Sequence, residues 1–231
     1  MTGLYWRWYY GVTYLNNDIV YKEQTSALES FLGSMSEISY NSFRAIQLHR
    51  TKGLQTKIMK ENDIRIPKTL VTNDKNALLD FYYSNDKNII FKPVQGGAFT
   101  KIMTDKDLSR ADNLVNCPCQ LQEFVDGVDI RVYAFESGEV FAGEIIAKHI
   151  DFRQDNEAVI NPVKLPSKVE KDCLKILKLL ELKYSGIDIR LSKSGEYVFL
   201  EANPAPMFYH FENMSKHPIT ETLIKNLVGN E

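Results

Sequence analysis

Residues 187–206 read IDIRLSKSGEYVFLEANPAP and predict a β-hairpin. Apolar residues alternate at 187–191, as is typical of a strand, and Ser194-Gly195 is a turn signal. The β-rich run at 197–200 then forms the second strand. We therefore expect these two runs to pair as antiparallel strands, and the rest of the chain to be arranged around this hairpin.

Three oxygen-bearing side chains lie on the hairpin: Asp188 on its first strand, and Glu201 and Asn203 at the end of its second. Because side chains alternate along a strand, Glu201 and Asn203 share a face if the strand continues to Asn203. Antiparallel pairing can then bring Asp188 beside them. Two carboxylates and an amide oxygen suit a hard cation such as Mg²⁺, which takes its other ligands from waters and nucleotide phosphates. The alternative is a turn-capping Asp188 and a solvated Glu201, but Glu201 follows the apolar run 198–200, where an unpaired charge is costly.

The composition is that of an ordinary globular protein. The chain has 231 residues, of which 44% are hydrophobic and 25% charged, and its formal net charge is −2. This balance gives no general attraction to nucleic acid or to an anionic membrane, and no apolar run approaches the roughly 20 residues of a membrane span. The three cysteines lack metal-ligand spacing and are interpreted as free thiols in a reducing compartment, so we expect a cytoplasmic protein.

The first 40 residues are the least regular part of the sequence. Residues 4–14 are rich in Trp and Tyr, and no apolar elements precede them to cover these rings. We therefore expect residues 1–40 to be the remnant of an amino-terminal module, or their uncovered surface to be buried by another subunit in a homodimer.

Two helical regions are predicted downstream. The first begins at Asn41 or Ser42, either of which can cap it. The second runs from Pro166 to Tyr184 and is the clearest helix of the chain. Its apolar residues on one face are Val169, Cys173, Ile176, Leu177 and Leu180.

A lysine and a glycine loop follow an apolar strand in the first half of the chain. Lys92 ends the strand, and the loop 95–100 reads QGGAFT. Gly96 and Gly97 let backbone amides approach phosphate oxygens, and the lysine supplies a point charge. The alternative is that the two glycines form an ordinary hairpin turn without a ligand. Lys52, further upstream, is either a surface lysine or a second phosphate ligand.

An extended segment at 120–125 precedes a turn and a strand at 130–135. Such a segment can offer backbone donors and acceptors to an adenine edge, and Asp129 is then positioned for a ribose hydroxyl. An ordinary β-meander accounts for this segment equally well. Arg153 lies in a charged loop, where a guanidinium can stabilise a transferring phosphoryl group or form a surface salt bridge.

Taken in order, these motifs resemble the ATP-grasp superfamily. The order is a lysine after an Asn-initiated helix, a strand lysine with a glycine loop (FKPVQGG), a hinge (QEFVDGVDIR), an arginine loop (DFRQD) and the metal ligands (GIDIR … FLEANP). No single motif is specific, but the ordered set is, and the resemblance covers residues 41–228. Within the superfamily the chain looks most like the glutamate ligases of ribosomal protein tails and the maturases of microviridin-type (graspetide) peptides.

The resemblance implies an α+β ATP-grasp fold over residues 41–231, in which two lobes with antiparallel sheets clasp ATP. The small lobe would lie at about 65–120 and carry the glycine loop, and the carboxyl-terminal lobe at 121–231 would carry the metal site. The implied nucleotide-binding residues are Lys52, Lys92, Gly96, Gly97, Gln122, Glu123, Phe124, Val125 and Asp129. The implied ligands of Mg²⁺, or of Mn²⁺ in its place, are Asp188, Glu201 and Asn203.

The implied reaction is the ATP-dependent joining of a carboxylate to an amine or hydroxyl through an acylphosphate, with release of ADP and phosphate. Arg153 would steady the transferred charge, and Arg131 would bind the carboxylate of a peptide, protein or amino-acid substrate. The alternative is a catalytically impaired nucleotide-binding module that acts with a partner. A protein-kinase-like phosphotransferase is disfavoured because the chain lacks the His-Arg-Asp catalytic loop.

Overall fold

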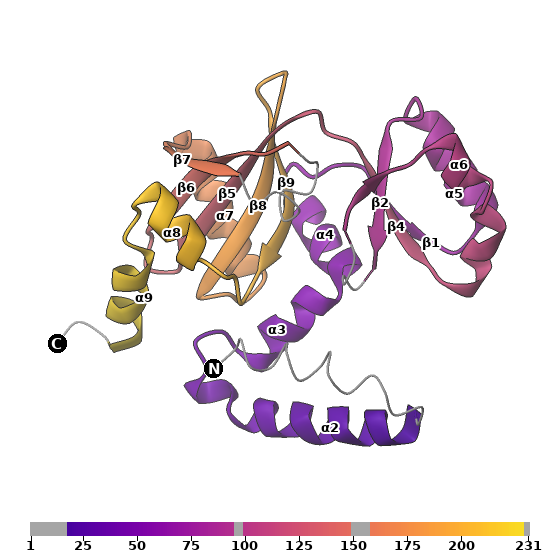
Figure 1. Cartoon of the computed structure of the whole chain (residues 1–231). Coiled ribbons are helices and arrows are strands. Elements are labelled where there is room, and N and C mark those ends of the chain that lie inside the picture. Colours follow the sequence, from indigo (N-terminus) through magenta and orange to yellow (C-terminus); the bar gives the residue numbers. More distant parts are fainter. Residues whose placement is uncertain (1–17, 95–98, 149–157, 229–231) are drawn as a thin grey trace.

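The protein contains two antiparallel sheets with helices packed on and between them (Figure 1). The structure is a computed structural model that describes residues 18–94, 99–148 and 158–228. Both sheets implied by the resemblance are therefore present. None of the helices in these ranges is both long and apolar enough to cross a membrane.

The smaller sheet has the strand order β1-β4-β2-β3. Its strands are β1 (Thr69–Thr72), β2 (Ile89–Pro93), β3 (Lys101–Ile102) and β4 (Cys119–Glu123). Three helical elements accompany it, namely α5 (Lys75–Ser84), α6 (Asp105–Leu108) and η2 (Ala111–Asn116). The buried apolar cluster that holds α5 on this sheet consists of Leu78, Tyr82, Ile89, Met103 and Leu121.

The larger sheet has the strand order β7-β6-β5-β8-β9. Its strands are β5 (Gly127–Phe135), β6 (Val140–Ile146), β7 (Val159–Val163), β8 (Tyr184–Ser192) and β9 (Tyr197–Asn203). The chain passes directly from β4 to β5 through residues 124–126, so this short connection joins the two sheets. The predicted extended segment and strand are confirmed, but the turn predicted between them is not, because residues 124–126 form no turn and β5 already begins at Gly127.

Helix α7 (Ser167–Leu179) covers one face of the larger sheet. All five residues of its predicted apolar face are buried, so the predicted face is confirmed. The helix ends before Tyr184, however, because Glu181 adopts a left-handed φ of 56°. The N–H of Leu182 then turns back to donate to the Leu177 carbonyl at 2.8 Å, which closes the helix, and Tyr184 begins β8 instead.

Strand β5 separates its side chains between the two faces of the sheet. Ile130, Val132 and Ala134 belong to the buried cluster that includes the apolar face of α7. The opposite face begins with charged residues next to the connection and ends in the aromatic residues Tyr133 and Phe135. These rings pack with residues of α8 (Tyr209–Ser215) and α9 (Ile219–Val228). Only the charged end of this face is therefore open for a polar site.

The amino-terminal helices lie below the sheets in Figure 1, except for the last of them, which lies between the sheets. They are α2 (Asp18–Ser34), η1 (Ser36–Ile38), α3 (Phe43–Arg50) and α4 (Lys52–Glu61). Glu29 of α2 binds α3 by accepting from Arg50 Nη1 at 2.7 Å and from Gln47 Nε2 at 3.1 Å. Helices α3 and α4 lead from there to the gap between the sheets, so they can deliver side chains to both (Figure 1).

Ser42 is the N-cap of α3, since its hydroxyl accepts from the N–H of Ala45 at 3.2 Å. Asn41, the other candidate cap, is buried and joins two distant segments. Its Nδ2 donates to the carbonyls of Tyr184 at 2.7 Å and Pro204 at 2.6 Å. Its Oδ1 accepts from the N–H of Lys183 at 2.8 Å. Asn41 thus ties the start of β8 to the segment that follows β9.

We predict that Asn41→Ala destabilises the protein strongly, because it leaves buried carbonyl and N–H groups without partners. The expected cost is on the order of 2–4 kcal/mol, or roughly 5–15 °C in Tm for a chain of this size. Asn226→Ala removes one bond to the Thr222 carbonyl on α9 and serves as the control, with an expected loss below about 1 kcal/mol. Equal thermal melting curves for both variants would contradict the role of Asn41.

Candidate functional site

The predicted hairpin is formed by β8 and β9, and β9 continues to Asn203 as the site requires. Asp188 lies opposite Glu201, and Gly186 lies opposite Asn203. The three oxygen-bearing side chains therefore meet at one end of the hairpin. A β-bulge between Asp188 and Ile189 then shifts the register, so that Ile189 pairs with Phe199.

Arg131 of β5 lies opposite Asp188 on the other side of β8. Arg131, Asp188 and Glu201 therefore form one row across three neighbouring strands, and Lys52 of α4 completes it. Arg131 Nη1 is 2.5 Å from Asp188 Oδ1, and Lys52 Nζ is 2.5 Å from Glu201 Oε2. The four side chains are only 11–23% exposed. We call these four residues the charged row.

Lys52 reaches Glu201 because α4 is fastened to the backbone of β9. The side-chain amide of Gln55 donates to the Ala202 carbonyl at 2.9 Å and accepts from the Ala202 N–H at 2.9 Å. His49 Nδ1 lies 3.1 Å from the same carbonyl oxygen and is the donor there. Sequence reasoning missed Gln55 and His49. The sequence did contain a signal for Gln55: at helical spacing this polar residue shares one face with Lys52 and with Met59, which is buried.

Burial and nearby charges shift the pKa values of Glu201, a member of the charged row, and of the neighbouring His49. Burial raises the pKa of Glu201, but the charges of Lys52 and Lys92, the Lys52 hydrogen bond and nearby His49 outweigh it and lower the value to about 2. Burial lowers the pKa of His49, and Lys52 adds to this effect against the opposing influence of Glu201. At neutral pH an ionised Glu201 in the charged row therefore lies near a neutral His49.

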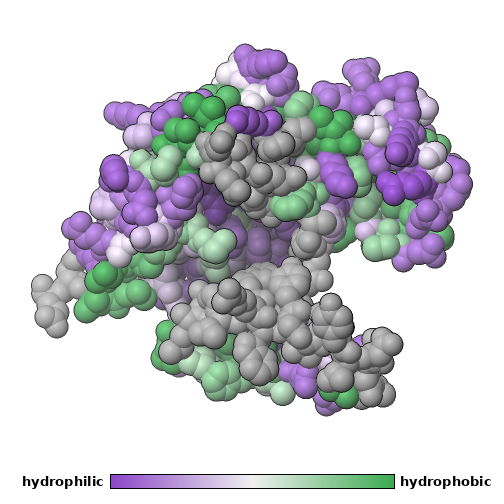
Figure 2. Space-filling view, viewed as in Figure 1, coloured by the Kyte–Doolittle hydropathy of each residue, from purple (hydrophilic) through white to green (hydrophobic). Residues whose placement is uncertain are grey.

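Lys92 and Gln122 come from the smaller sheet. Lys92 Nζ lies 3.5 Å from Gln122 Oε1, and the Gln122 amide donates to Thr69 Oγ1 at 3.0 Å. The charge of Lys92 is one of the influences that lower the pKa of Glu201. Figure 2 shows a hollow above α2 whose visible floor is hydrophilic. The smaller sheet and the charged row thus contribute to one polar site.

In the predicted adenine-binding segment, residues 123–125, two backbone N–H groups already donate to other parts of the protein. The N–H of Glu123 donates to the Lys68 carbonyl at 2.9 Å, and that of Phe124 to the Asn88 carbonyl at 3.0 Å. The Glu123 carboxylate accepts from the Lys68 N–H at 3.0 Å. Within the part of the chain that the structure describes, the Val125 N–H makes no backbone hydrogen bond, and neither does the Glu123 carbonyl outside the strand ladder of β4. One acceptor and one donor, two residues apart, are therefore left for a ligand.

Asp129, the predicted ribose ligand, forms an ion pair with Arg190 of β8 at 2.9 Å. Arg190 was not among the predicted site residues. Gly96, Gly97 and Arg153 lie outside the described residues, so their predicted roles stay predictions.

The oxygen ligands suit a hard divalent cation. Asn203 Oδ1 accepts from the Ala205 N–H at 2.9 Å, which fixes the amide and leaves a second lone pair on its oxygen. Within the described ranges no group of three or more His, Cys, Asp and Glu side chains is placed to hold a metal. Two carboxylates and an amide oxygen therefore have to be supplemented by waters or ligand oxygens, which is the usual arrangement for Mg²⁺.

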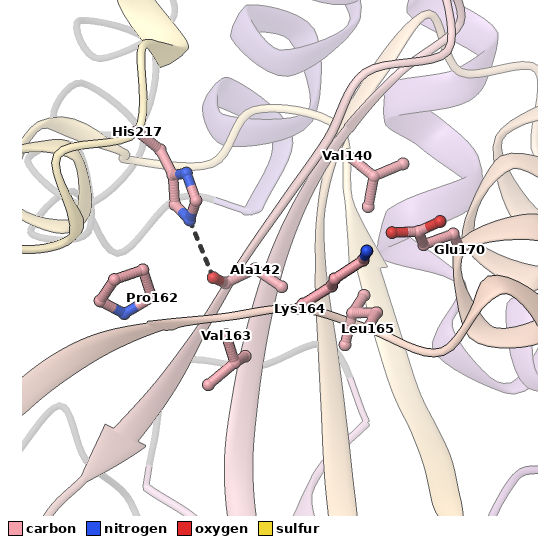
Figure 3. A pocket seen from close by; sticks show the side chains of 8 residues that line it. All are labelled: Val140, Ala142, Pro162, Val163, Lys164, Leu165, Glu170 and His217. Atoms are coloured by element: carbon pink, nitrogen blue, oxygen red, sulfur yellow. Dashed lines mark hydrogen bonds between the residues drawn. The ribbon is translucent and has the colours of Figure 1, made fainter.

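A separate cavity of about 360 Å³ lies beside β6 and β7 (Figure 3). His217 lies at its edge and donates from Nε2 to the Ala142 carbonyl at 3.0 Å. The side chains of Lys164 and Glu170 also line it. It shares no lining residue with the charged row.

The chain matches the family model described as the RimK-like ATP-grasp domain over residues 49–227. The coenzyme γ-F420-2:α-L-glutamate ligase of Methanococcus maripaludis is 26% identical over 204 residues, which is 80% of this chain and 70% of that relative.

Solved structures of ATP-grasp ligases are similar to this one. The ATP-grasp ligase PsnB, in complex with a minimal precursor, is 32% identical with a TM-score of 0.81, over 91% of this chain and 72% of PsnB. PsnB is also known with a minimal precursor, Mg and ADP. The macrocyclase MdnC of Microcystis aeruginosa, bound with the precursor peptide MdnA, is 23% identical with a TM-score of 0.80, over 95% of this chain and 75% of MdnC. The likeness to MdnC concerns the fold alone. The predicted α+β ATP-grasp fold is confirmed.

We predict that Glu201 makes stability depend on pH. Its folded-state pKa lies below the ordinary value of 4.5, so its ionised form stabilises the fold above pH 4.5, and this contribution is lost as the pH falls towards 2. In urea unfolding at pH 6, the free energy of unfolding of the wild type should exceed that of Glu201→Gln by on the order of 2 kcal/mol. The difference should shrink at pH 3.

The control for this comparison is Glu196→Gln, which changes a 59% exposed carboxylate on the same hairpin. Its free energy of unfolding should stay within about 0.5 kcal/mol of the wild type at both pH values. A wild-type advantage over Glu201→Gln that is the same at pH 6 and pH 3 would contradict the lowered pKa.

Proposed function

Because the chain belongs to the RimK-like ATP-grasp family, we propose that it is an ATP-dependent ligase that joins the carboxylate of a peptide or amino acid to an amine or hydroxyl. The observation that carries this proposal is the charged row, in which Asp188 and Glu201 lie side by side between two cations. The row lies near Lys92 of the other sheet, so phosphate groups and a cation can be bound at the same place.

ATP would lie between the sheets. Lys52 and Lys92 supply positive charge for its phosphates, together with the backbone of Gly96 and Gly97. The Glu123 carbonyl and the Val125 N–H can accept from and donate to the adenine edge. Gln122 and Phe124 flank these groups on β4 and the connection, and Asp129 would bind the ribose.

Asp188, Glu201 and Asn203 would hold Mg²⁺, or Mn²⁺, which favours similar oxygen ligands. When bound, the ion neutralises phosphate charge. Lys52 and Arg131 balance the two carboxylates in the structure described here. Arg131 also fixes the orientation of Asp188, and we assign it the further task of binding the substrate carboxylate.

The reaction would proceed in two transfers. A carboxylate oxygen of the substrate attacks the γ-phosphorus, so that an acylphosphate forms and ADP leaves. An amine or hydroxyl then attacks the acyl carbon, phosphate leaves with the bonding electron pair, and the nucleophile loses its proton. The enzyme mainly positions the reactants and offsets charge, with Arg153 assigned to the transferred phosphoryl group.

A peptide is the substrate that we favour. The segment after Asn203 has its backbone fixed, since Tyr133 Oη donates to the Met207 carbonyl at 2.7 Å. It nevertheless exposes Met207 and Tyr209 by 94% and 74%. Apolar side chains on a fixed backbone beside the proposed metal ligands can contact residues that flank a substrate carboxylate. PsnB, which is 32% identical, binds a precursor peptide.

The test is ADP release with a panel of peptides that contain Glu or Asp together with Lys, Ser or Thr. Mass spectrometry of the product should show the loss of one water for each intramolecular bond. We predict that Glu201→Gln lowers turnover on the order of 100-fold or more, because the charge that holds the ion is lost. Glu196→Gln is the matched control and should keep wild-type turnover.

Wild-type turnover in Glu201→Gln would contradict the metal assignment. A wild type that binds ATP with Mg²⁺ but releases no ADP with any carboxylate peptide or amino acid would favour the alternative, a nucleotide-binding module that acts with a partner.

We also predict that Arg153→Ala lowers kcat by about 10- to 100-fold, because a guanidinium that stabilises a transferring phosphoryl group acts mainly in the transition state. The KM for ATP should change little. Arg44→Ala is the control, since Arg44 is 82% exposed and pairs with Glu181. An unchanged kcat in Arg153→Ala would remove this residue from the mechanism.

A further inference from the structure

The same tripeptide, Asp-Ile-Arg, occurs at residues 129–131 and 188–190. The two copies are antiparallel partners on β5 and β8, with Ile130 opposite Ile189. Each aspartate therefore faces the arginine of the other copy. The result is two ion pairs of opposite orientation, Arg131 with Asp188 at 2.5 Å and Arg190 with Asp129 at 2.9 Å.

Arg190 also donates hydrogen bonds to two backbone carbonyls, in addition to its ion pair with Asp129. Its Nε donates to the Val125 carbonyl at 3.1 Å and its Nη2 to the Gly127 carbonyl at 2.8 Å. With Nη1 bound to Asp129, all three guanidinium nitrogens are engaged, and the side chain is only 14% exposed. The planar, forked guanidinium can satisfy three acceptors at fixed angles, which a lysine ammonium on a flexible stem does not reproduce.

These contacts fasten the connection between the sheets to β8. Lys193 N–H, three residues after Arg190, donates to the carbonyl of Asp126 at 3.0 Å. Gly127 passes so close to β8 that an added Cβ would lie 1.9 Å from the Leu191 carbonyl oxygen. The backbone of the connection is thus held at each of its positions from Val125 to Gly127 by the end of one strand.

We propose that Arg190 is a positioning residue for the adenosine part of the nucleotide, an inference that rests on the proposed function. Arg190 fixes the backbone next to the free Val125 N–H, and it orients the carboxylate of Asp129 for the ribose. Asp188, a proposed metal ligand, lies two residues away on the same strand. Strand β8 therefore sets the spacing between the adenosine site and the metal site.

This role separates Arg190 from a residue that only stabilises the fold. Loss of the guanidinium fork should weaken the contacts to base and ribose while the phosphate-binding lysines and metal ligands stay in place. ATP should then lose affinity, whereas inorganic tripolyphosphate, which has the phosphates without the adenosine, should not.

The experiment is calorimetric titration of Mg²⁺-ATP and Mg²⁺-tripolyphosphate into the full chain and into Arg190→Lys. We expect Arg190→Lys to lower the affinity for ATP by about 10- to 100-fold, because charge-assisted hydrogen bonds are lost. The affinity for tripolyphosphate should stay unchanged. In ADP-release assays the KM for ATP should rise by a similar factor, while kcat stays within about threefold. Arg44→Lys, at an 82% exposed position, is the control and should alter neither ligand.

Arg190→Gln provides a second variant, because the shorter neutral amide loses the ion pair with Asp129 and the forked contact to the two backbone carbonyls, while the Asp129 carboxylate itself is kept. This variant should also lower the affinity for ATP and leave the affinity for tripolyphosphate unchanged. Unchanged ATP affinity in Arg190→Lys, or an equal loss for ATP and tripolyphosphate, would overturn the inference. If Arg190→Lys does not fold, the same two outcomes for Arg190→Gln decide. A wild type that binds no ATP would instead overturn the proposed function, and the inference with it.

Discussion

The pairing register of β5, β8 and β9 is the constraint on which the whole site depends. A shift of one residue would turn Arg131 and Asp188 towards the face covered by α7. The β-bulge after Asp188 adds a second requirement. It leaves Glu201 beside Asp188 and places Phe199 opposite Ile189, in the buried cluster under α7. Without the extra residue, regular alternation would put Phe199 and Glu201 on the same face.

The charge order along the row explains how two carboxylates can be neighbours in a half-buried place. Like charges on directly opposite strand positions repel. Arg131 and Lys52, at the two ends, offset this repulsion, and Lys52 together with Lys92 keeps Glu201 ionised. The site therefore has acidic oxygens ready for a cation and lysines ready for phosphates at the same pH. Mg²⁺ and a triphosphate bound together bring charges of both signs, which this arrangement can accept as a pair.

The local parts of the site could be predicted from the sequence, because the signals were local. Alternation and a turn signal located the hairpin, and the spacing of Glu201 and Asn203 placed them on one face. Contacts between distant segments could not be found in this way. Lys52 and Glu201 are 149 residues apart, and nothing near Lys52 in the sequence indicates its partner. Asn41 was a candidate helix cap, but tertiary contacts with Tyr184 and Pro204 use its side chain instead.

The measurement that tests the central claim most directly is thermal unfolding with ATP, with and without Mg²⁺, on the wild type and on Glu201→Gln. ATP at about 100 times its Kd should stabilise the wild type by roughly 2.7 kcal/mol, or on the order of 5–10 °C in Tm for a chain of this size. The account predicts that the rise requires Mg²⁺ and is largely lost in Glu201→Gln. No rise with Mg²⁺-ATP, or an equal rise in both proteins, would contradict a nucleotide and metal site built on the charged row.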